Sequence, residues 1–189
     1  MSNISLDRIR RNHALEHASI NVLTERHKGF SAQGNSTPNG FNLNIYGNIA
    51  EDEVYDAVEE AFRRLKAGES RLGLHPTCGT VLLTTAGLAA ISAQFVFAVE
   101  MKRQGRTKLG ISGLLSSLPM ATMAVLISLI ISKPLGMTIQ KTYTVDSELR
   151  DLAITSIQPV KPSLVNRLFQ LLLGQSKNSS KSYRIKTIG

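Results

Sequence analysis

Two histidines and a glutamate stand close together near the amino terminus, in the order His13-Ala-Leu-Glu16-His17. Histidines at positions i and i+4 lie one turn apart on one face of an α-helix, so both imidazoles can reach a single Zn²⁺ ion at about 2.0–2.1 Å. A glutamate directly before the second histidine can accept a proton from zinc-bound water, whose pKa the metal lowers to about 7. The spacing therefore predicts a metal site with His13 and His17 as ligands and Glu16 as the candidate catalytic base.

A zinc site of this kind needs at least one more protein ligand, and the candidates are His75 and Cys78, spaced H-x-x-C. Three protein ligands leave the fourth position for water, as in catalytic sites, whereas a fourth ligand from the Cys78 thiolate would make a closed structural site. The alternative is that His13 and His17 are ordinary core histidines, with Glu16 in an ion pair with a core-facing arginine.

The motif must be carried by a helix for this chemistry to work. Ser5 is a suitable N-cap and Gly29 a suitable stop. At 100° per residue, the apolar face of the helix between them also carries the three motif side chains (Leu6, Ile9, Ile20 and Leu23 with His13, Glu16 and His17). Buried polar groups need partners, and a buried carboxylate needs a positive charge or a metal.

Three further elements complete a small domain over residues 1–79. Phe41–Tyr46 alternates apolar and polar residues after an Asn-Gly turn, which predicts a strand with Phe30–Gln33 as its hairpin partner. Glu51–Ala67 has apolar residues at helical spacing, and Leu72–His75 is expected to form a short strand. The sequence predicts an α+β domain in the order helix, hairpin, helix, strand.

Two long uncharged runs follow this domain. Thr80–Val99 holds 20 residues without a charge and Leu109–Ser132 holds 24, and a helix of either length can cross a hydrocarbon layer of roughly 30 Å. Residues 80–132 are therefore predicted to form a transmembrane helical hairpin, with spans at 80–99 and 109–132. Neither span contains a charged residue, so a channel or pump is not expected.

The last part of the chain, residues 133–189, carries 9 basic and 3 acidic residues and most of the net charge of +8. Asp151–Pro159 predicts a strand that could join the amino-terminal sheet. Ser163–Leu173 predicts a short amphipathic helix, which either lies in the lipid headgroup plane or packs on the small domain. The Ser-, Lys- and Asn-rich end is expected to be disordered from about residue 175.

The charges near the spans give conflicting indications of topology. Four basic residues in the connecting loop favour a cytoplasmic loop, whereas seven basic residues flank the outer ends of the spans (Arg63, Arg64, Lys66, Arg71, Lys133, Lys141 and Arg150). A cytoplasmic loop would also require export of a 79-residue amino-terminal domain without a signal peptide. We therefore expect an integral membrane protein with two spans and both termini in the cytoplasm. Expected partners are the lipid bilayer and either a membrane-protein complex or a second copy of the chain. Nucleic acid is not expected as a partner, since aromatic residues make up 5% of the chain and no recognised module occurs.

At the motif itself the chain resembles the inverzincins, the insulinase-like zinc peptidases that share the order H-x-x-E-H. The resemblance covers five residues and implies zinc-dependent hydrolysis. Those enzymes are longer and take their third ligand, a glutamate, from a later helix. The corresponding helix here would be Glu51–Ala67, whose Glu59 and Glu60 project away from its apolar face.

A second resemblance covers most of the chain. The segments Arg11–Ala18, Gly68-Glu69, His75–Gly79 and Leu149–Ile157, together with the two apolar runs, resemble a family of short, uncharacterised bacterial membrane proteins. Photosynthetic bacteria are among the hosts of that family. The resemblance implies the same two-span layout and no particular activity.

Two hypotheses of function follow. The first is a membrane-anchored, non-catalytic module, stabilised by zinc, that acts as an assembly or scaffold factor. The second is a membrane-tethered zinc hydrolase in which His13 and His17 bind the metal and Glu16 is the base, with His75 or Cys78 completing the site.

Overall fold

The computed structural model describes residues 2–105, 110–162 and 180–189. The chain divides into two compact units, one made of residues 1–75 and 143–189 and the other of residues 76–142. The predicted amphipathic helix at 163–173 and the loop residues Arg106 and Lys108 lie outside the described residues.

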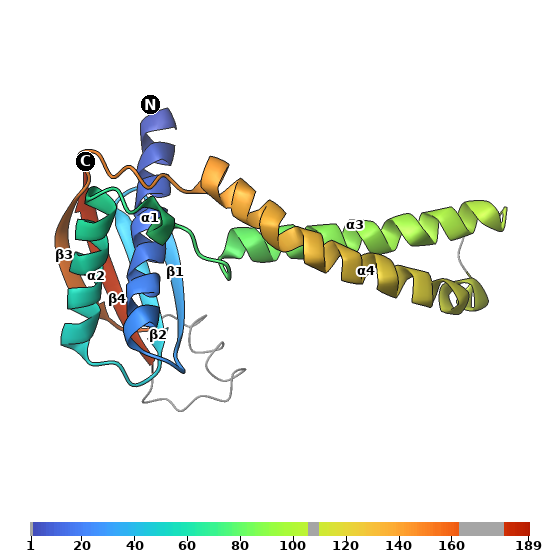
Figure 1. Ribbon diagram of the computed structural model, residues 1–189, viewed down its shortest axis with the longest axis horizontal. Helices are drawn as coiled ribbons and strands as arrows, with labels where there is room; N and C mark the ends of the chain where they lie inside the picture. Colours follow the sequence, from blue (N-terminus) through green and yellow to red (C-terminus); the bar gives the residue numbers. More distant parts are fainter. Residues whose placement is uncertain (1, 106–109, 163–179) are drawn as a thin grey trace. The chain divides into compact units, whose positions relative to one another are not determined.

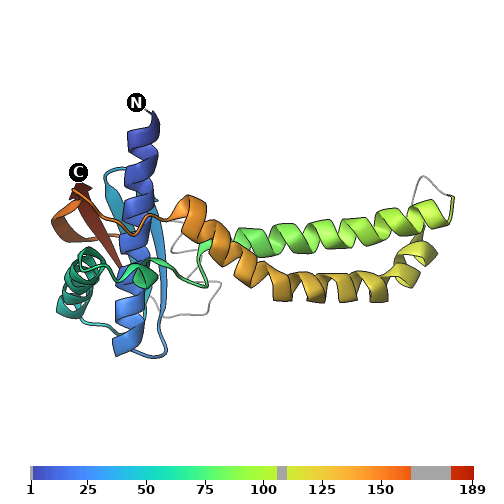
Figure 2. The ribbon, with the colours of Figure 1, turned by 45° about the horizontal axis from the view of Figure 1, so that its top comes forward.

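The first unit is a four-stranded antiparallel sheet with two helices on one face (Figures 1 and 2). Its helices and strands are α1 (Ser2–Arg26), β1 (Ser31–Thr37), β2 (Gly40–Tyr46), α2 (Glu51–Lys66), β3 (Ala153–Val160) and β4 (Ser180–Ile188). The strand order is β1-β2-β4-β3, so strands from both ends of the chain share one sheet. The α+β class predicted from the sequence is confirmed.

The core of this unit lies between the helices and the sheet. Strand β2 places Phe41, Leu43 and Ile45 in it, as the predicted alternation requires. Helix α2 adds residues at helical spacing (Val54, Ala57, Val58, Ala61 and Leu65). Acidic residues occupy the first turn of α2 and basic residues its last turn, which matches the helix dipole.

The short strand predicted at Leu72–His75 is wrong, because a 3₁₀ helix occupies Ser70–Gly73. The backbone carbonyl groups of this segment explain why it does not form a strand. The carbonyls of residues 72 to 74 accept hydrogen bonds from side chains of α1, as described below, instead of pairing with a strand. Gly73 is also packed so closely that a Cβ there would lie 2.4 Å from Ser147 Oγ.

The expected disorder from about residue 175 is wrong for residues 180–188, which form β4 in the middle of the sheet. Tyr183, Ile185 and Thr187 alternate into the core, while lysine and arginine stand between them. Strand β3 pairs with β4, so the segment predicted at Asp151–Pro159 does join the amino-terminal sheet.

The second unit is a helical hairpin of α3 (Gly79–Arg103) and α4 (Ile111–Ile139). A π-helical turn at Gln140–Thr144 follows α4 and ends in the first unit. Both helices are long and apolar enough to cross a membrane. Helix α4 runs past the predicted end at residue 132. Its buried residues are all small: Gly113, Ser117, Ala121, Ser128, Ser132 and Gly136.

Close approach holds the two helices of the hairpin together. A Cβ on Gly136 would lie 2.9 Å from Val81 Cα of α3, and Thr85 Oγ1 donates a hydrogen bond to Ser132 Oγ at 2.9 Å. The large apolar side chains of α4, such as Leu126 and Ile130, point outward. Small residues at a helix contact with large ones outside are typical of helices in lipid.

Candidate metal centre

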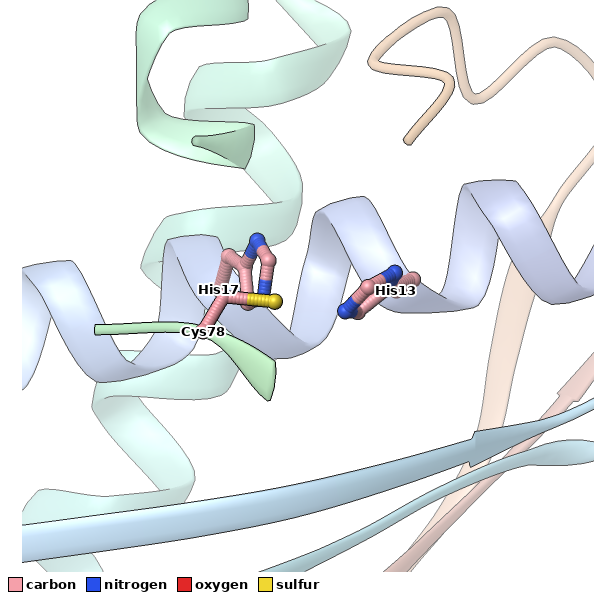
Figure 3. Close-up of side chains that lie close together, drawn as sticks. All are labelled: His13, His17 and Cys78. Carbon is pink, nitrogen blue, oxygen red and sulfur yellow. The ribbon is translucent and has the colours of Figure 1, made fainter. Parts of the chain in front are cut away.

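Three of the four histidines of the chain gather beside α1. His13 and His17 lie one turn apart on the same face of the helix, with ring centroids 4.2 Å apart (Figure 3). The ring of His75, which follows the 3₁₀ helix, lies 5.9 Å from the ring of His17. The first unit therefore places the predicted ligands His13 and His17 together, from positions i and i+4 of one helix, and His75 beside His17.

The imidazoles of His13 and His17 are oriented by backbone carbonyls. Nδ1 of His13 lies 2.9 Å from the carbonyl oxygen of Thr144, and Nδ1 of His17 lies 2.8 Å from that of Gly73. A carbonyl oxygen only accepts, so each Nδ1 must carry the proton and donate it. In the neutral form of both rings, Nε2 is then the basic nitrogen.

His75 has the same arrangement, with a side-chain amide in place of the backbone. Its Nδ1 lies 2.8 Å from Oδ1 of Asn21. The amide nitrogen of Asn21 donates to the carbonyls of Leu72 and Leu74 at 2.8 and 2.9 Å, which fixes the amide so that its oxygen faces His75. All three histidines thus donate from Nδ1 to an amide oxygen, as zinc-ligating histidines usually do.

Glu16, the predicted catalytic base, is held by β1. It is 5% exposed, and its Oε2 accepts a hydrogen bond from Ser36 Oγ at 2.5 Å. The carboxyl group lies directly over Gly34, where a Cβ would be 2.0 Å from Oε1. These contacts give Glu16 a role in attaching α1 to the sheet, and its role as a base stays a prediction.

Cys78, the other predicted ligand, belongs to the second unit. It is the N-cap residue of α3, and its Sγ accepts from the backbone N–H of Thr80 at 3.5 Å. It follows His75 by three residues, so the chain alone keeps their Cα atoms within about 11 Å of each other. The assignment of Cys78 as a ligand stays a prediction.

Two buried residues beside the motif were not predicted from the sequence. Arg11 is 5% exposed, and its Nη1 lies 2.5 Å from Asp151 Oδ1. This hydrogen bond lowers the pKa of the Asp151 carboxyl, helped by one from the residue's own backbone. Asn12 donates to the Thr37 carbonyl and accepts from Thr187 Oγ1, both at 2.8 Å.

The fourth histidine lies apart from the others. His27 follows the last residue of α1, and its Nε2 is 3.3 Å from Glu53 Oε1 of α2. Its place at the end of α1 suits a histidine that offsets the helix dipole. It is therefore a natural control for the other three.

Residues 8–157 match a family described as a domain of unknown function, DUF6391, and the chain belongs to that family. An uncharacterised protein from Picosynechococcus sp. is 43% identical over 98 residues, which cover 45% of this chain. The aligned region spans 47% of that relative, about half its length. No solved structure matches the chain. The predicted membership of an uncharacterised family is confirmed.

Proposed function

We propose that this member of the DUF6391 family is a membrane-anchored, non-catalytic module that acts as an assembly or scaffold factor. Its small domain holds a zinc ion at His13, His17 and His75, with Cys78 as the candidate fourth ligand. The observation that carries the metal site is the pair of imidazoles of His13 and His17, with His75 beside His17, each with Nδ1 bonded to an amide oxygen. This bond fixes the tautomer that offers Nε2 to a metal.

The contacts of the motif support a non-catalytic role. Each polar residue from Arg11 to His17 has a long-range partner in another segment: Arg11 reaches Asp151, Asn12 reaches β1 and β4, and Glu16 reaches Ser36. Side chains with such long-range hydrogen bonds stabilise the fold, which favours a structural role for the motif over a catalytic one. A metal at the same place adds stability, since binding to the folded state alone favours that state.

The sheet topology supports the membrane part of the proposal. Strands β1 and β2 precede the hairpin and β3 and β4 follow it, yet all four share one sheet. If α3 and α4 cross a bilayer, both ends of the hairpin must lie on the same side. That agrees with two spans and both termini in the cytoplasm. Within the bilayer, the hairpin would contact lipid and either a partner membrane protein or a second copy of the chain.

A membrane-tethered zinc hydrolase is the alternative. It would use the same ligands and Glu16 as the general base. The Glu16→Gln variant separates the two proposals, because it keeps an amide oxygen that can accept from Ser36. In a hydrolase this change abolishes turnover while the metal stays bound. In a structural module it changes the stability of the small domain, and there is no catalytic activity for it to abolish.

The test of the metal site is elemental analysis of purified full-length protein, for the wild type and for His13→Ala, His17→Ala and His75→Ala. We expect about one zinc per wild-type chain and a loss of most of it in each variant. The matched control is His27→Ala, which removes a histidine from the same domain outside the cluster and should keep the metal.

Two outcomes contradict the site. Negligible metal in the wild type after purification in zinc-containing buffer would overturn it, as would equal metal in all four variants. Cys78→Ser decides the number of ligands. A large loss of affinity makes the site closed and structural, whereas unchanged affinity leaves a three-histidine site with a position for water.

A further inference from the structure

Two stretches of chain connect the small domain to the helical hairpin, and His13 and His17 of α1 contact one each, while His75 lies within the first of them. We call residues 70–75, before the hairpin, the entry segment and residues 143–147, after it, the exit segment. Both belong to the first unit. Neither is a strand of the sheet, and a 3₁₀ helix is the regular structure of the entry segment. Their attachment to α1 depends on side chains and, in the exit segment, also on one backbone hydrogen bond from Asp146 to Arg10.

The entry segment is held by three consecutive carbonyls. Gly73 accepts from His17, and the carbonyls on either side of it, at Leu72 and Leu74, accept from Asn21. Asn21 in turn accepts from His75. Two of the proposed ligands thus hold this segment to α1: His17 bonds to its backbone, and His75, which belongs to the segment, bonds to Asn21 of α1.

The exit segment is held by the third histidine and by its neighbours on α1. The carbonyl of Thr144 accepts from His13. The next two residues bond to Arg10: the Val145 carbonyl accepts from its Nη2 at 3.3 Å, and the Asp146 N–H donates to its carbonyl at 3.1 Å. Ser147 Oγ donates to the carbonyl of Ser70 at 3.0 Å and so joins the exit segment to the entry segment.

We propose that metal binding at these histidines fixes the entry and exit segments to α1, so that the metal controls how firmly the hairpin is attached to the small domain. This inference rests on the metal site proposed above. A metal on Nε2 makes the Nδ1–H a stronger donor, and ligation holds each ring in the position that reaches its carbonyl. Release of the metal removes both effects at the two segments together.

Amide hydrogen exchange reports on this attachment, at the entry segment through a hydrogen bond within the segment and at the exit segment through a hydrogen bond to α1. The reporting groups are the N–H of Leu74, which donates to Arg71, and the N–H of Asp146, which donates to Arg10. If the metal binds the attached state alone, opening is suppressed by the factor 1 + [L]/Kd. Exchange at both amides should then slow by about 100-fold at a free Zn²⁺ concentration of 100 times Kd.

The experiment uses the full-length protein in lipid nanodiscs, with zinc or with a chelator, and bound metal is measured in the same samples. Amides of the β2–β4 ladder serve as the reference, because they lie in the sheet away from both segments. Slowing at Leu74 and Asp146 that exceeds the change in the ladder supports the inference. Bound zinc with no such difference overturns it and leaves the metal site intact, whereas no bound zinc overturns both.

The Asn21→Ala variant tests the route of the effect. It removes the hydrogen bonds by which Asn21 joins α1 to Leu72, Leu74 and His75, and it leaves the three imidazoles and the bond from His17 to Gly73 in place. At the same multiple of its own Kd, zinc should slow exchange at Asp146 as in the wild type and should slow it less at Leu74, where the bond from His17 to Gly73 remains. Equal slowing at both amides would show that Asn21 does not transmit the effect and would contradict the proposed connection.

Discussion

Helices α1 and α4 are of similar length, 25 and 29 residues, but they bury opposite kinds of side chain. Helix α1 buries polar groups among its apolar ones, including Arg11, Asn12 and His17. Helix α4 buries glycine, alanine and serine and turns its leucines and isoleucines outward. The first is fixed by specific hydrogen bonds inside a domain, and the second by close backbone approach.

This difference is the one expected if α1 packs inside a water-soluble domain and α4 lies in lipid. A water-soluble domain gains stability when large apolar side chains leave water, and it can keep polar groups inside if each one has a partner. A helix in lipid gains nothing by burying a leucine against its neighbour, so small residues form the contact. The predictions below compare equivalent changes in the two units.

The largest contrast should come from truncating a leucine. Leu15 of α1 is 0% exposed and Leu126 of α4 is 49% exposed. We expect Leu15→Ala to destabilise the small domain by about 2–5 kcal/mol, because it leaves a cavity. Leu126→Ala should change the unfolding of that domain by less than about 0.5 kcal/mol. Tyrosine fluorescence during urea unfolding in detergent measures both, and similar losses would contradict the comparison.

A newly introduced charge should have the opposite pattern, with the larger effect in the hairpin and the smaller one in the small domain. Leu126→Arg should reduce membrane integration by about 2.5–3.5 kcal/mol if α4 spans the bilayer. Leu6→Arg is the control, since Leu6 is 58% exposed on α1 and an arginine there remains in water. Membrane fractionation and carbonate extraction of both variants measure the effect. Full integration of Leu126→Arg would contradict the assignment of α4 as a span.

The sequence predicted the elements that have a local pattern better than those that depend on long-range contacts. The apolar runs at 80–99 and 109–132 and the pattern of Glu51–Ala67 are local, so helices could be predicted from them. Strand β4 could not, because Tyr183 and Ile185 are apolar in a segment rich in lysine and serine, and their burial depends on pairing with β2. Long-range contacts of this kind override local composition.

The candidate site was predictable in the same partial way. The H-x-x-E-H spacing placed His13 and His17 on one helix face, and the structure brings His75 beside them. The partners that orient the three rings are two backbone carbonyls and Asn21, which no spacing rule identifies. Glu16 was assigned from its position in the motif, and its contact with Ser36 depends on how β1 packs against α1.

Two glycines test the close contacts in the small domain against the open surface of the hairpin. A Cβ at Gly34 would overlap the Glu16 carboxyl, whereas a Cβ at Gly87 of α3 would meet nothing within 4 Å. Gly34→Ala should therefore cost about 1–3 kcal/mol through displacement of Glu16. Gly87→Ala should be neutral or stabilise the helix by up to about 1 kcal/mol. Equal unfolding free energies for the two variants would show that Glu16 does not lie over β1.

The smallest expected effect concerns pH. Arg11 lowers the pKa of Asp151 below its ordinary value of 3.8, chiefly by hydrogen bonding to the carboxylate. A lowered pKa in the folded state means that the unfolded chain binds the proton more readily. The stability from this pair is therefore complete above about pH 4 and is lost as the pH falls through the lowered pKa.

We expect Asp151→Asn to be less stable than the wild type at pH 7 and to lose less stability between pH 4 and pH 2. Urea unfolding at several pH values measures this, with Asp56→Asn, on the exposed side of α2, as the control. Parallel pH profiles for the wild type and Asp151→Asn would mean that the buried guanidinium of Arg11 is satisfied without the carboxylate, by the carbonyls of Asp7 and Leu149 to which it also donates. In that case the charge of Asp151 would contribute nothing to holding residues 149–151 against α1, and the buried arginine would act in the same way as Asn12, through neutral acceptors alone.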